Sequence, residues 1–399
     1  MTGDSDPRRW RILGLLTLAE FLGMSPWLLF GAVAGQLKAG WGLMTGDLAW
    51  LSATVQLGFV CGTLAVAVFN IADVVPARTC FSVCALLVAL ANAIPVAAPG
   101  FLPALASRFL IGFFLSGVYP PAMKMVATWF RSGRGLAIGT LLGGLVFGKS
   151  MPYLIHSMGD LRWDRMLLVA SVASLAAGAL VALGYRDGPL AFPPRRFSWG
   201  LVPAILGHRP TRLVIAGYLG HMWELYAMWS WIPAFLAASS IRTLGPHAAD
   251  VFAFAAIASG ALGSLWGGWV ADRRGRPFVV NVSMAASGAC ALLVGVFFSG
   301  NAGLLVAIVL AWGFFVVSDS AQFSAMVTET APADAVGTAL TLQTSLGFLL
   351  SMATIQAVPR LMEWKGWPWA FALLSVGPFL GIVAVRQFVR GEGPRKPTP

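Results

Sequence analysis

Ionisable side chains occur inside long apolar segments of this sequence, and each of them is a candidate for chemistry. Burying a charge in an apolar segment costs free energy unless the charge is paired or hydrated, so such residues commonly serve a function. The acids and the histidine could carry protons, and the cations could bind an anion. The candidates are Glu20, Arg108, Lys124, Lys149, His221, Glu224 and Asp319.

Glu20 and Glu224 occupy matching places in two apolar segments, because each is followed by Met four residues later and by Trp seven residues later. Burial disfavours a charged carboxylate, so either residue could bind and release a proton near neutral pH. His221 lies three residues before Glu224, on the same face of a helix. The two side chains could form a proton site, or they could simply satisfy each other's hydrogen bonds.

The three cations could attract an anionic group. Lys149 lies in the middle of an apolar segment beside glycines spaced four or five residues apart, which predict close packing against a neighbour. We therefore expect Lys149 to point into a cavity, for substrate binding or ion pairing. Arg108 and Lys124 are 16 residues apart, roughly 24 Å along a helix, so they form separate sites. Each could instead extend toward the nearer membrane surface.

Asp319 stands between two serines near the middle of its segment. It could pair with Lys149 or Arg108 across a cavity. The alternative is a carboxylic acid that is capped by its neighbouring hydroxyl groups. A cluster of Met, Trp and Tyr residues near Glu224 resembles a copper or cation cage, but such residues are also ordinary packing material in membrane spans. We expect no metal site there.

The elements that position these residues are membrane spans. The chain has 399 residues, of which 58% are hydrophobic and 11% charged, and its mean hydropathy is +0.77. Soluble domains carry about 25% charged residues. A spanning helix needs about 20 apolar residues, so the chain has room for roughly twelve, and its continuous apolar runs exclude an alternating β-barrel pattern. We predict an all-α membrane protein with twelve transmembrane helices.

A polar gap at 186–210 divides these spans into six plus six, which predicts an N-terminal bundle at 1–185, a linker, and a C-terminal bundle at 211–399. The expected spans are 12–36, 47–71, 78–98, 101–129, 134–157, 165–185, 211–238, 249–271, 277–299, 302–328, 335–360 and 367–389.

The two halves also repeat in sequence. Gly-Phe-Phe occurs at 112–114 and at 313–315, and a related Ala-(Ile/Val)-Gly-Thr motif occurs at 137–140 and at 335–338. The Glu-Met-Trp spacing recurs in the same order. Three matches at similar offsets indicate pseudo-symmetric halves.

Loop cations predict the orientation. The net charge of +11 would suit nucleic acid in a soluble protein, but here the cations gather on one side of the predicted spans. If the N-terminus is inside, inner segments hold 18 Lys and Arg, outer segments hold six, and the spans hold three. We therefore expect both termini in the cytoplasm, in a bacterial inner membrane, and no nucleic-acid partner.

The short connection at 268–277 contains three arginines and one aspartate. Gly268 would allow close approach of two helices, and Gly275 a tight turn. Asp272 could accept hydrogen bonds from nearby arginines or from the N-terminus of a neighbouring helix. The simpler interpretation is a basic loop that only fixes topology.

The pattern G-x-x-x-D-R-x-G-R in this connection resembles the cytoplasmic loop motif of the major facilitator superfamily, with Pro277 where a basic residue is usual. Arg108 begins R-x-x-x-G, which resembles a fourth-helix motif of that family that is often linked to proton coupling. The first-half counterpart of the loop keeps Asp73 but lacks most of the other motif residues. The residues assigned to a conformational loop motif are Asp73, Gly268, Asp272, Arg273, Gly275 and Arg276.

The resemblance implies a monomeric secondary transporter that works by alternating access, with a small-molecule site between the two bundles. The three intramembrane cations indicate an anionic solute, and the acids indicate coupling to protons, as in symport. The alternatives are an exporter of an apolar or cationic compound on the same fold, or a membrane sensor or scaffold that transports nothing. The family's antiporter motif is absent from 134–157, which disfavours drug–proton antiport. Without a Walker sequence or a catalytic nucleophile motif, we expect neither ATP hydrolysis, nor an enzyme, nor a cofactor.

Overall fold

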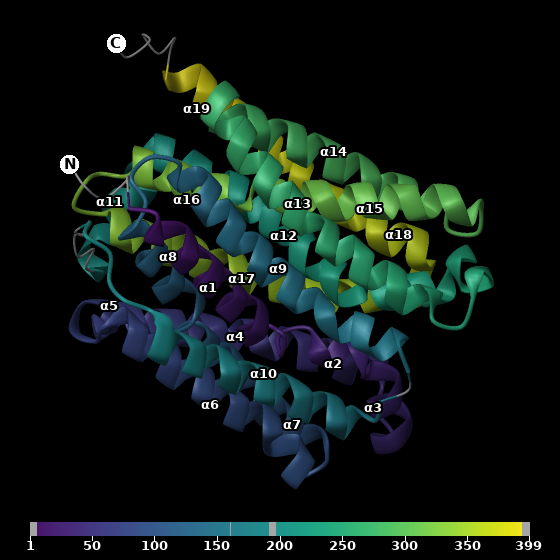
Figure 1. Ribbon diagram of the computed structural model, residues 1–399. Helices are drawn as coiled ribbons and strands as arrows, with labels where there is room; N and C mark the ends of the chain where they lie inside the picture. The colour runs from purple at the N-terminus through teal and green to yellow at the C-terminus, as the bar shows by residue number, and fades with distance from the viewer. Residues whose placement is uncertain (1–5, 160, 191–196, 393–399) are drawn as a thin grey trace.

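The computed structural model describes residues 6–159, 161–190 and 197–392, and all regular elements within them are helices (Figure 1). The helices of the first half are α1 (Arg8–Gly23), α2 (Leu29–Ala32), α3 (Ala34–Trp41), α4 (Thr45–Val68), α5 (Ile71–Val74), α6 (Ala77–Ala97), α7 (Phe101–Leu115), α8 (Tyr119–Ala127), α9 (Arg134–Ser157) and α10 (Trp163–Gly184). Those that follow are η1 (Trp199–Leu201), α11 (Val202–Gly207), α12 (Arg209–Ala238), η2 (Ser240–Leu244), α13 (Ala248–Arg274), α14 (Arg276–Val296), α15 (Ala302–Ser318), α16 (Ser320–Thr330), α17 (Val336–Lys365), α18 (Trp367–Ala372), η3 (Leu373–Ser375) and α19 (Val376–Glu392).

Within the described residues, ten helical segments are long and apolar enough to cross a membrane. The remaining two predicted spans are also helical, but each departs from a plain apolar helix. The first is divided among α1, α2 and α3, and the seventh, α12, contains polar residues that lower its hydropathy. These two spans carry Glu20 and Glu224. The prediction of an all-α membrane protein with twelve spans is confirmed.

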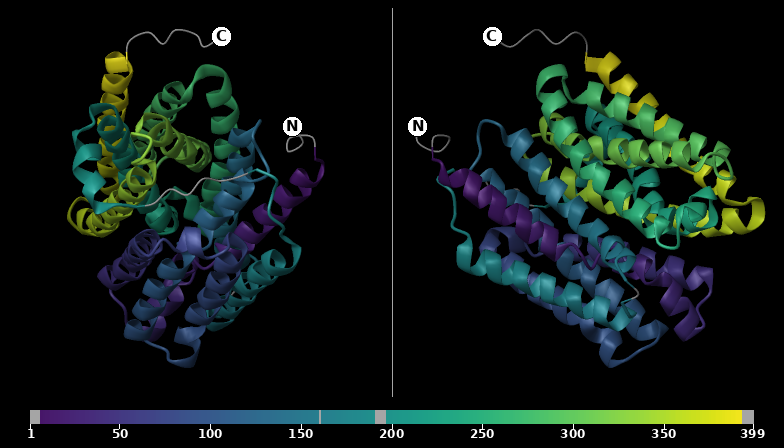
Figure 2. Two further views of the ribbon diagram at one scale, coloured as in Figure 1. Left: turned by 90° about the vertical axis from the view of Figure 1, so that its left-hand side faces the viewer. Right: turned by 45° about the vertical axis from the view of Figure 1, so that its right-hand side comes forward.

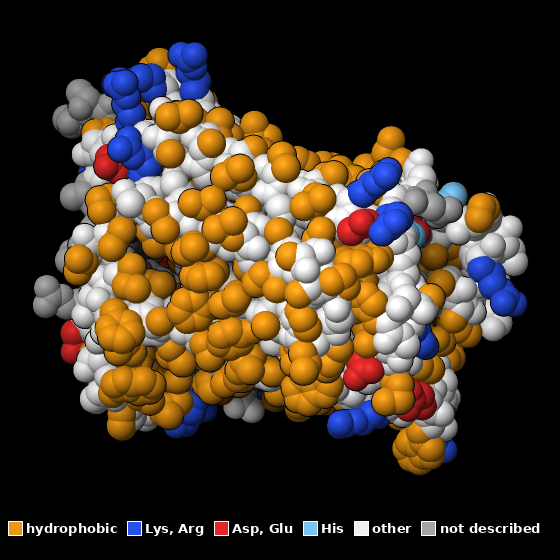
Figure 3. Space-filling view, turned by 90° about the horizontal axis from the view of Figure 1, so that it is seen from below, with side chains coloured by type: hydrophobic (Ala, Val, Ile, Leu, Met, Phe, Trp, Pro, Cys, Tyr) orange, Lys and Arg blue, Asp and Glu red, His pale blue; other side chains and the backbone are white. Residues whose placement is uncertain are grey.

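The spans form two bundles that lie side by side. In Figure 1, most of helices α1–α10 occupy the lower part of the molecule and most of α12–α19 the upper part, and where the bundles meet α9 packs along α13 and α17 along α4. The views in Figure 2 show the same division. Helix α1 begins and α19 ends at the same end of the molecule. Figure 3 shows a broad hydrophobic face whose charged side chains gather toward its two ends, as a surrounding bilayer requires.

The internal repeat is visible in the packing of the two bundles. A Cβ on Gly112 of α7 would collide with the carbonyl oxygen of Val55 in α4. A Cβ on Gly313 of α15 would collide with the carbonyl oxygen of Ala256 in α13. Gly313 and Ala256 follow Gly112 and Val55, respectively, by 201 positions, which is also the distance between the two Gly-Phe-Phe motifs. The halves are therefore pseudo-symmetric in backbone contacts as well as in sequence.

Four predicted spans are interrupted at positions without a clear sequence boundary, and in the twelfth the short 3₁₀ turn η3 lies between α18 and α19. The first breaks between Gly23 and Leu29, the fourth between Leu115 and Tyr119, and the tenth at Asp319. Pro26 lies in the first break and cannot donate a backbone hydrogen bond, and Pro120 and its neighbour start the helix after the second. The breaks in the fourth and tenth spans occupy equivalent places in the two bundles, which continues the repeat.

Helix α9 uses glycines on two faces. On one face, a Cβ on Gly139 would lie 3.1 Å from the carbonyl oxygen of Ser264 in α13, and Gly143 lies beside Ala261 of the same helix. On another face, a Cβ on Gly148 would collide with the carbonyl oxygen of Phe21 in α1. The prediction that these glycines allow close backbone packing is confirmed. Lys149 is held by this packing at a fixed position between the bundles.

Candidate functional site

A central cavity of about 660 Å³ lies between the two bundles and is lined by residues of both. It extends toward the end of the molecule that carries the α13–α14 connection, which we call the loop-motif end. Arg134, Arg276 and the exposed Glu329 line the cavity there. The cavity is large enough for a drug-sized organic molecule, because ligand pockets are typically about 300–1,000 Å³.

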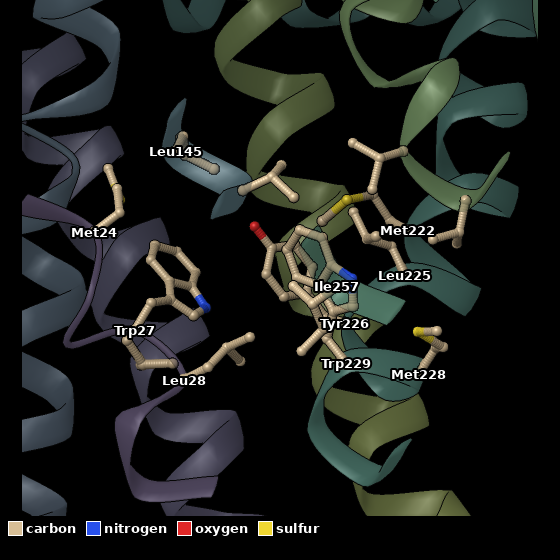
Figure 4. Packing of buried hydrophobic residues seen from close by; sticks show 14 of the residues in the cluster. Met24, Trp27, Leu28, Leu145, Met222, Leu225, Tyr226, Met228, Trp229 and Ile257 are labelled. Atoms are coloured by element: carbon tan, nitrogen blue, oxygen red, sulfur yellow. The ribbon is translucent and has the colours of Figure 1, made fainter. Parts of the chain in front are cut away.

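Aromatic side chains from both bundles close the end of the cavity that lies away from the loop-motif end. This aromatic floor consists of Trp27, Phe59, Tyr226 and Phe348, which all line the cavity. The ring centroids of Trp27 and Tyr226 are 5.6 Å apart, and those of Phe59 and Phe348 are 4.6 Å apart. Figure 4 shows Trp27 and Tyr226 pointing toward each other across the space between the bundles. These contacts join the two halves on the side away from the loop-motif end.

Lys149 lies at the aromatic floor and is 2% exposed. Its Nζ donates a hydrogen bond of 3.0 Å to the hydroxyl oxygen of Tyr226, in the other bundle. The same ammonium group lies 3.8 Å from the ring centroid of Trp27 and 5.3 Å from that of Trp229. Such cation–π contacts hold a desolvated cation in place. The expectation that Lys149 points into a cavity is confirmed.

Glu20 lies just behind the cavity wall and is fully buried. Neither of its carboxylate oxygens has a hydrogen-bond partner in the described part of the protein. It interacts electrostatically with Lys149 and with Tyr119, both of which line the cavity. A buried carboxyl group with nothing to fix its charge can exchange a proton when its cationic neighbour changes partner.

Glu224 is not equivalent to Glu20 in its surroundings. Its carboxylate accepts hydrogen bonds from the hydroxyl of Ser287, at 2.8 Å, and from the indole N–H of Trp312, at 2.6 Å. Both partners belong to its own bundle, and Glu224 is not among the residues that line the cavity. The matched sequence spacing of the two glutamates therefore did not predict their different surroundings.

His221 does not pair with Glu224, so the sequence-based pairing was wrong. Its Nδ1 lies 2.9 Å from a carboxylate oxygen of Asp319, and its Nε2 lies 3.1 Å from the hydroxyl of Ser320. His221 and Ser320 line the central cavity. The alternative pairing of Asp319 with Lys149 or Arg108 is also wrong, because the break between α15 and α16 turns Asp319 toward α12 inside the C-terminal bundle.

Arg108 is buried and binds backbone rather than extending to the membrane surface. Its guanidinium group donates hydrogen bonds to the carbonyl oxygens of Leu51, Pro26 and Trp27, at 3.0, 2.9 and 2.6 Å. Two of these carbonyls lie in the break after α1, where the helix leaves them without a backbone partner. Arg108 thus stabilises the break that places Trp27 in the aromatic floor.

Lys124 lines the central cavity nearer its mouth and is half-buried. It interacts electrostatically with Cys80 of α6. Arg108 lies in α7 and Lys124 in α8, on either side of a helix break, and Arg108 does not line the central cavity. The prediction that these two cations belong to separate sites is confirmed.

The loop motif joins the two bundles. The carboxylate of Asp272 lies directly against Gly135 in the first turn of α9, where a Cβ would be 3.1 Å from Oδ1. Gly268 approaches the same residue, and Gly275 has the positive φ of 83° that a tight turn favours. Asp272 thus lies at the N-terminus of the neighbouring helix, one of the two partners expected for it.

The remaining motif residues stabilise the loop itself. The guanidinium of Arg273 stacks 3.6 Å from the ring centroid of Trp269, and Arg276 donates hydrogen bonds to Glu329 and Gln322 of α16. Asp73 belongs to α5, but its side chain lies outside the described residues.

The opposite end of the molecule contains a contact between the bundles that the sequence did not reveal. Nδ1 of His156, at the end of α9, lies 2.8 Å from a carboxylate oxygen of Asp250, at the start of α13. Nε2 of His156 lies 3.4 Å from the side-chain amide of Gln36. The two residues lie at the ends of apolar segments and 94 positions apart, so no spacing in the sequence could have paired them.

Comparison with known proteins agrees with this geometry. Residues 15–355 match the family model described as Major Facilitator Superfamily. An MFS-type transporter, hasB, of Aspergillus fumigatus is 26% identical over 53% of this chain and 49% of its own length. A probable nitrate/nitrite antiporter, NarK1, of Thermus thermophilus is 28% identical over 47% of this chain and 40% of its own length. The chain thus spans about half the length, or less, of these curated relatives.

Two solved structures share the fold at low sequence identity. A bacterial homologue of the human lysosomal transporter Spinster, in an inward-facing and occupied conformation, superposes with a TM-score of 0.74 at 14% identity, covering 98% of this chain and all of that one. The human organic anion transporter MFSD10 gives a TM-score of 0.71 at 15% identity, covering 95% of this chain and all of that one.

Proposed function

The chain belongs to the Major Facilitator Superfamily, a family of membrane transporters and not of enzymes, and we propose that it moves a small organic anion coupled to protons. The observation that carries this proposal is Lys149, a buried ammonium group at the closed end of a cavity between the bundles. An anionic group at that position would gain a charge-assisted hydrogen bond in a place with little water.

The cavity favours an anion with an apolar body over a small inorganic ion. In addition to the aromatic floor, the cavity is lined by the apolar residues Met24, Leu142, Val146 and Met222. Pockets that bind organic ligands combine such apolar walls with a few polar groups that fix orientation. One relative is named as a nitrate/nitrite antiporter and one structural neighbour as an organic anion transporter, and both names agree with a negatively charged substrate.

Coupling to protons follows from the exchange of partners at Lys149. Glu20 is an electrostatic partner of Lys149, and in this proposal its carboxylate is charged while the site is empty. A bound anion would take over that role, and Glu20 would then hold a proton, since an unpaired carboxylate is costly in a buried site. Solute and proton would therefore bind together, as symport requires.

Transport into proteoliposomes under an imposed pH gradient tests this function. We expect accumulation of a labelled monocarboxylate with an apolar body, and weaker or no accumulation of its amide or of an organic cation. Accumulation of the cation instead would favour the exporter of cationic compounds. The absence of flux for anions, cations and neutral solutes alike would favour a membrane sensor or scaffold.

We propose that the loop-motif end and both termini face the cytoplasm of a bacterial inner membrane, because predicted inner segments hold 18 of the 27 cations. The central cavity reaches this end, so the arrangement is inward-facing. The protein would act as a monomer, with bundles at 1–185 and 211–399 joined by the 186–210 linker, of which 191–196 lie outside the described residues.

Cysteine labelling tests this orientation. In a variant without the four native cysteines, we expect an impermeant maleimide to label Lys365→Cys on intact cells and to spare Trp199→Cys. Both positions are exposed, so accessibility of the side chain does not decide the result. Labelling only at position 199 would reverse the orientation.

Asp272→Asn is expected to reduce transport severalfold more than it reduces the amount of protein in the membrane. Its charge lies at the N-terminus of α9, where a carboxylate is stabilised by roughly 0.3–1 kcal/mol or more, and this contact joins the bundles that must move. Losing about 1.4 kcal/mol would shift the populations of two conformations tenfold. Flux per molecule of protein gives the measurement.

Asp334→Asn is the matched control for this effect. Asp334 is another exposed acid at the same end, in the α16–α17 connection, and its replacement should leave flux unchanged. Equal flux in the Asp272 variant and this control would leave the loop with a role in topology only.

A further inference from the structure

A second, much smaller pocket lies next to the aromatic floor and has a different character from the central cavity. Trp27 lines both of them. The pocket has a volume of about 10 Å³, which is room for about one water-sized occupant. Its polar lining includes Gln56, Arg108 and Tyr153 from the N-terminal bundle and Ser230 from α12 of the other bundle.

Three polar groups around this pocket lack a hydrogen-bond partner in the described part of the protein. Within the described residues, the indole N–H of Trp27, the hydroxyl of Tyr153 and the side-chain oxygen of Gln56 have no hydrogen-bond partner, although each residue is 1% exposed or less. Buried polar groups are normally hydrogen-bonded, so unpartnered groups around one pocket point to a ligand. The indole group can only donate a hydrogen bond, and a phenol hydroxyl readily does so.

Arg108 adds a positive charge that the pocket does not neutralise. A guanidinium has five N–H donors, and three of those of Arg108 bind backbone carbonyls, which leaves two. No carboxylate is among the residues that line the pocket. The carboxylate of Asp250 interacts electrostatically with Tyr153, which lines the pocket, but it contacts His156. An excess of donors around an uncompensated cation selects an anion over a cation.

The backbone also keeps space for the Tyr153 hydroxyl. A Cβ on Gly31 of α2 would collide with that oxygen. Any larger residue at position 31 would therefore displace the phenol group from its place at the pocket. Gly31 has an ordinary backbone conformation, so its small size, and not its flexibility, matters here.

We propose that this pocket binds one monovalent anion of the size of chloride, held by Arg108, the indole N–H of Trp27 and the hydroxyl of Tyr153. The pocket is too small for an organic carboxylate, so it is distinct from the transport cavity. Its lining comes from both bundles on the side of the aromatic floor that is closed in this arrangement. A bound halide therefore stabilises the closed floor, and its release accompanies opening, because a ligand favours the conformation that it binds best.

Thermal unfolding of the purified protein in sodium chloride or sodium gluconate, at constant ionic strength, tests this site. We expect chloride and bromide to raise Tm in a saturable way and gluconate to have no such effect. Tyr153→Phe and Gly31→Ala should raise the half-saturating halide concentration at least about tenfold, the equivalent of one lost hydrogen bond to a charged ligand. Tyr185→Phe, a buried tyrosine in neither cavity, should leave it unchanged.

Two further measurements separate the halide site from the substrate site and from an ordered water. Lys149→Met should keep the halide response; loss of the response in this variant, but not in Tyr153→Phe, would place the halide in the central cavity and overturn the proposal.

Anomalous diffraction from crystals grown with bromide should show a peak beside Arg108 and Tyr153. This measurement needs only the unaltered protein, so it decides the matter even where a variant does not fold. A Tm independent of halide, with no bromide peak in the pocket, would mean that only water binds there. None of these results depends on whether the protein transports an organic anion.

Discussion

Lys149→Met should weaken the binding of an organic anion by roughly 2–5 kcal/mol, or at least about 30-fold, because the variant leaves a buried negative charge without its partner. Methionine has nearly the length of lysine, so it can keep its place among Trp27, Tyr226 and Trp229. An apolar or cationic compound should bind the variant as well as the unaltered protein, or better. Ligand-induced shifts in Tm across a panel of anions, amides and amines provide the measurement.

Lys124→Met is the control for this prediction. Lys124 lines the same cavity but is half-buried and nearer to water, so its loss should cost much less affinity. If Lys149→Met binds every anion of the panel with unaltered affinity, the main reason for assigning an anionic substrate disappears.

Glu20→Gln should abolish the accumulation of solute that a pH gradient drives, while exchange of labelled for unlabelled solute continues. Glutamine keeps the shape of the side chain but cannot release a proton. The loaded carrier can therefore still turn over, whereas net uptake stops because no proton is delivered. Both rates can be measured in the same proteoliposomes, so a variant that simply misfolds is recognised by the loss of both.

Glu224→Gln provides a matched comparison, because sequence alone could not choose between the two glutamates. Glu224 is fixed by hydrogen bonds to Ser287 and Trp312 and does not line the cavity. We expect this variant to retain proton-driven accumulation. Accumulation that survives in Glu20→Gln would move the proton site elsewhere, with the pair of His221 and Asp319 at the cavity wall as the next candidate.

The sequence by itself determined the membrane class, the twelve spans and the duplication of the halves. These features depend on local composition, since about 20 apolar residues must span a bilayer whatever surrounds them. The loop motif and the position of Lys149 also followed from local signals. Gly275 marks a turn, and the glycines of α9 mark faces that meet a neighbouring backbone.

The tertiary structure alone decided which side chains meet. Glu20 and Glu224 share their sequence spacing, yet within the described residues the carboxylate of Glu20 has no hydrogen-bond partner, whereas that of Glu224 accepts one hydrogen bond at each oxygen. His221 contacts Asp319, which lies 98 positions away at a helix break that no local sequence pattern predicted. Hydrogen bonds and ion pairs depend on the rotation of each helix about its axis and on its neighbours in the bundle. Hydropathy determines that a helix crosses the membrane, whereas packing determines which of its faces lines the cavity.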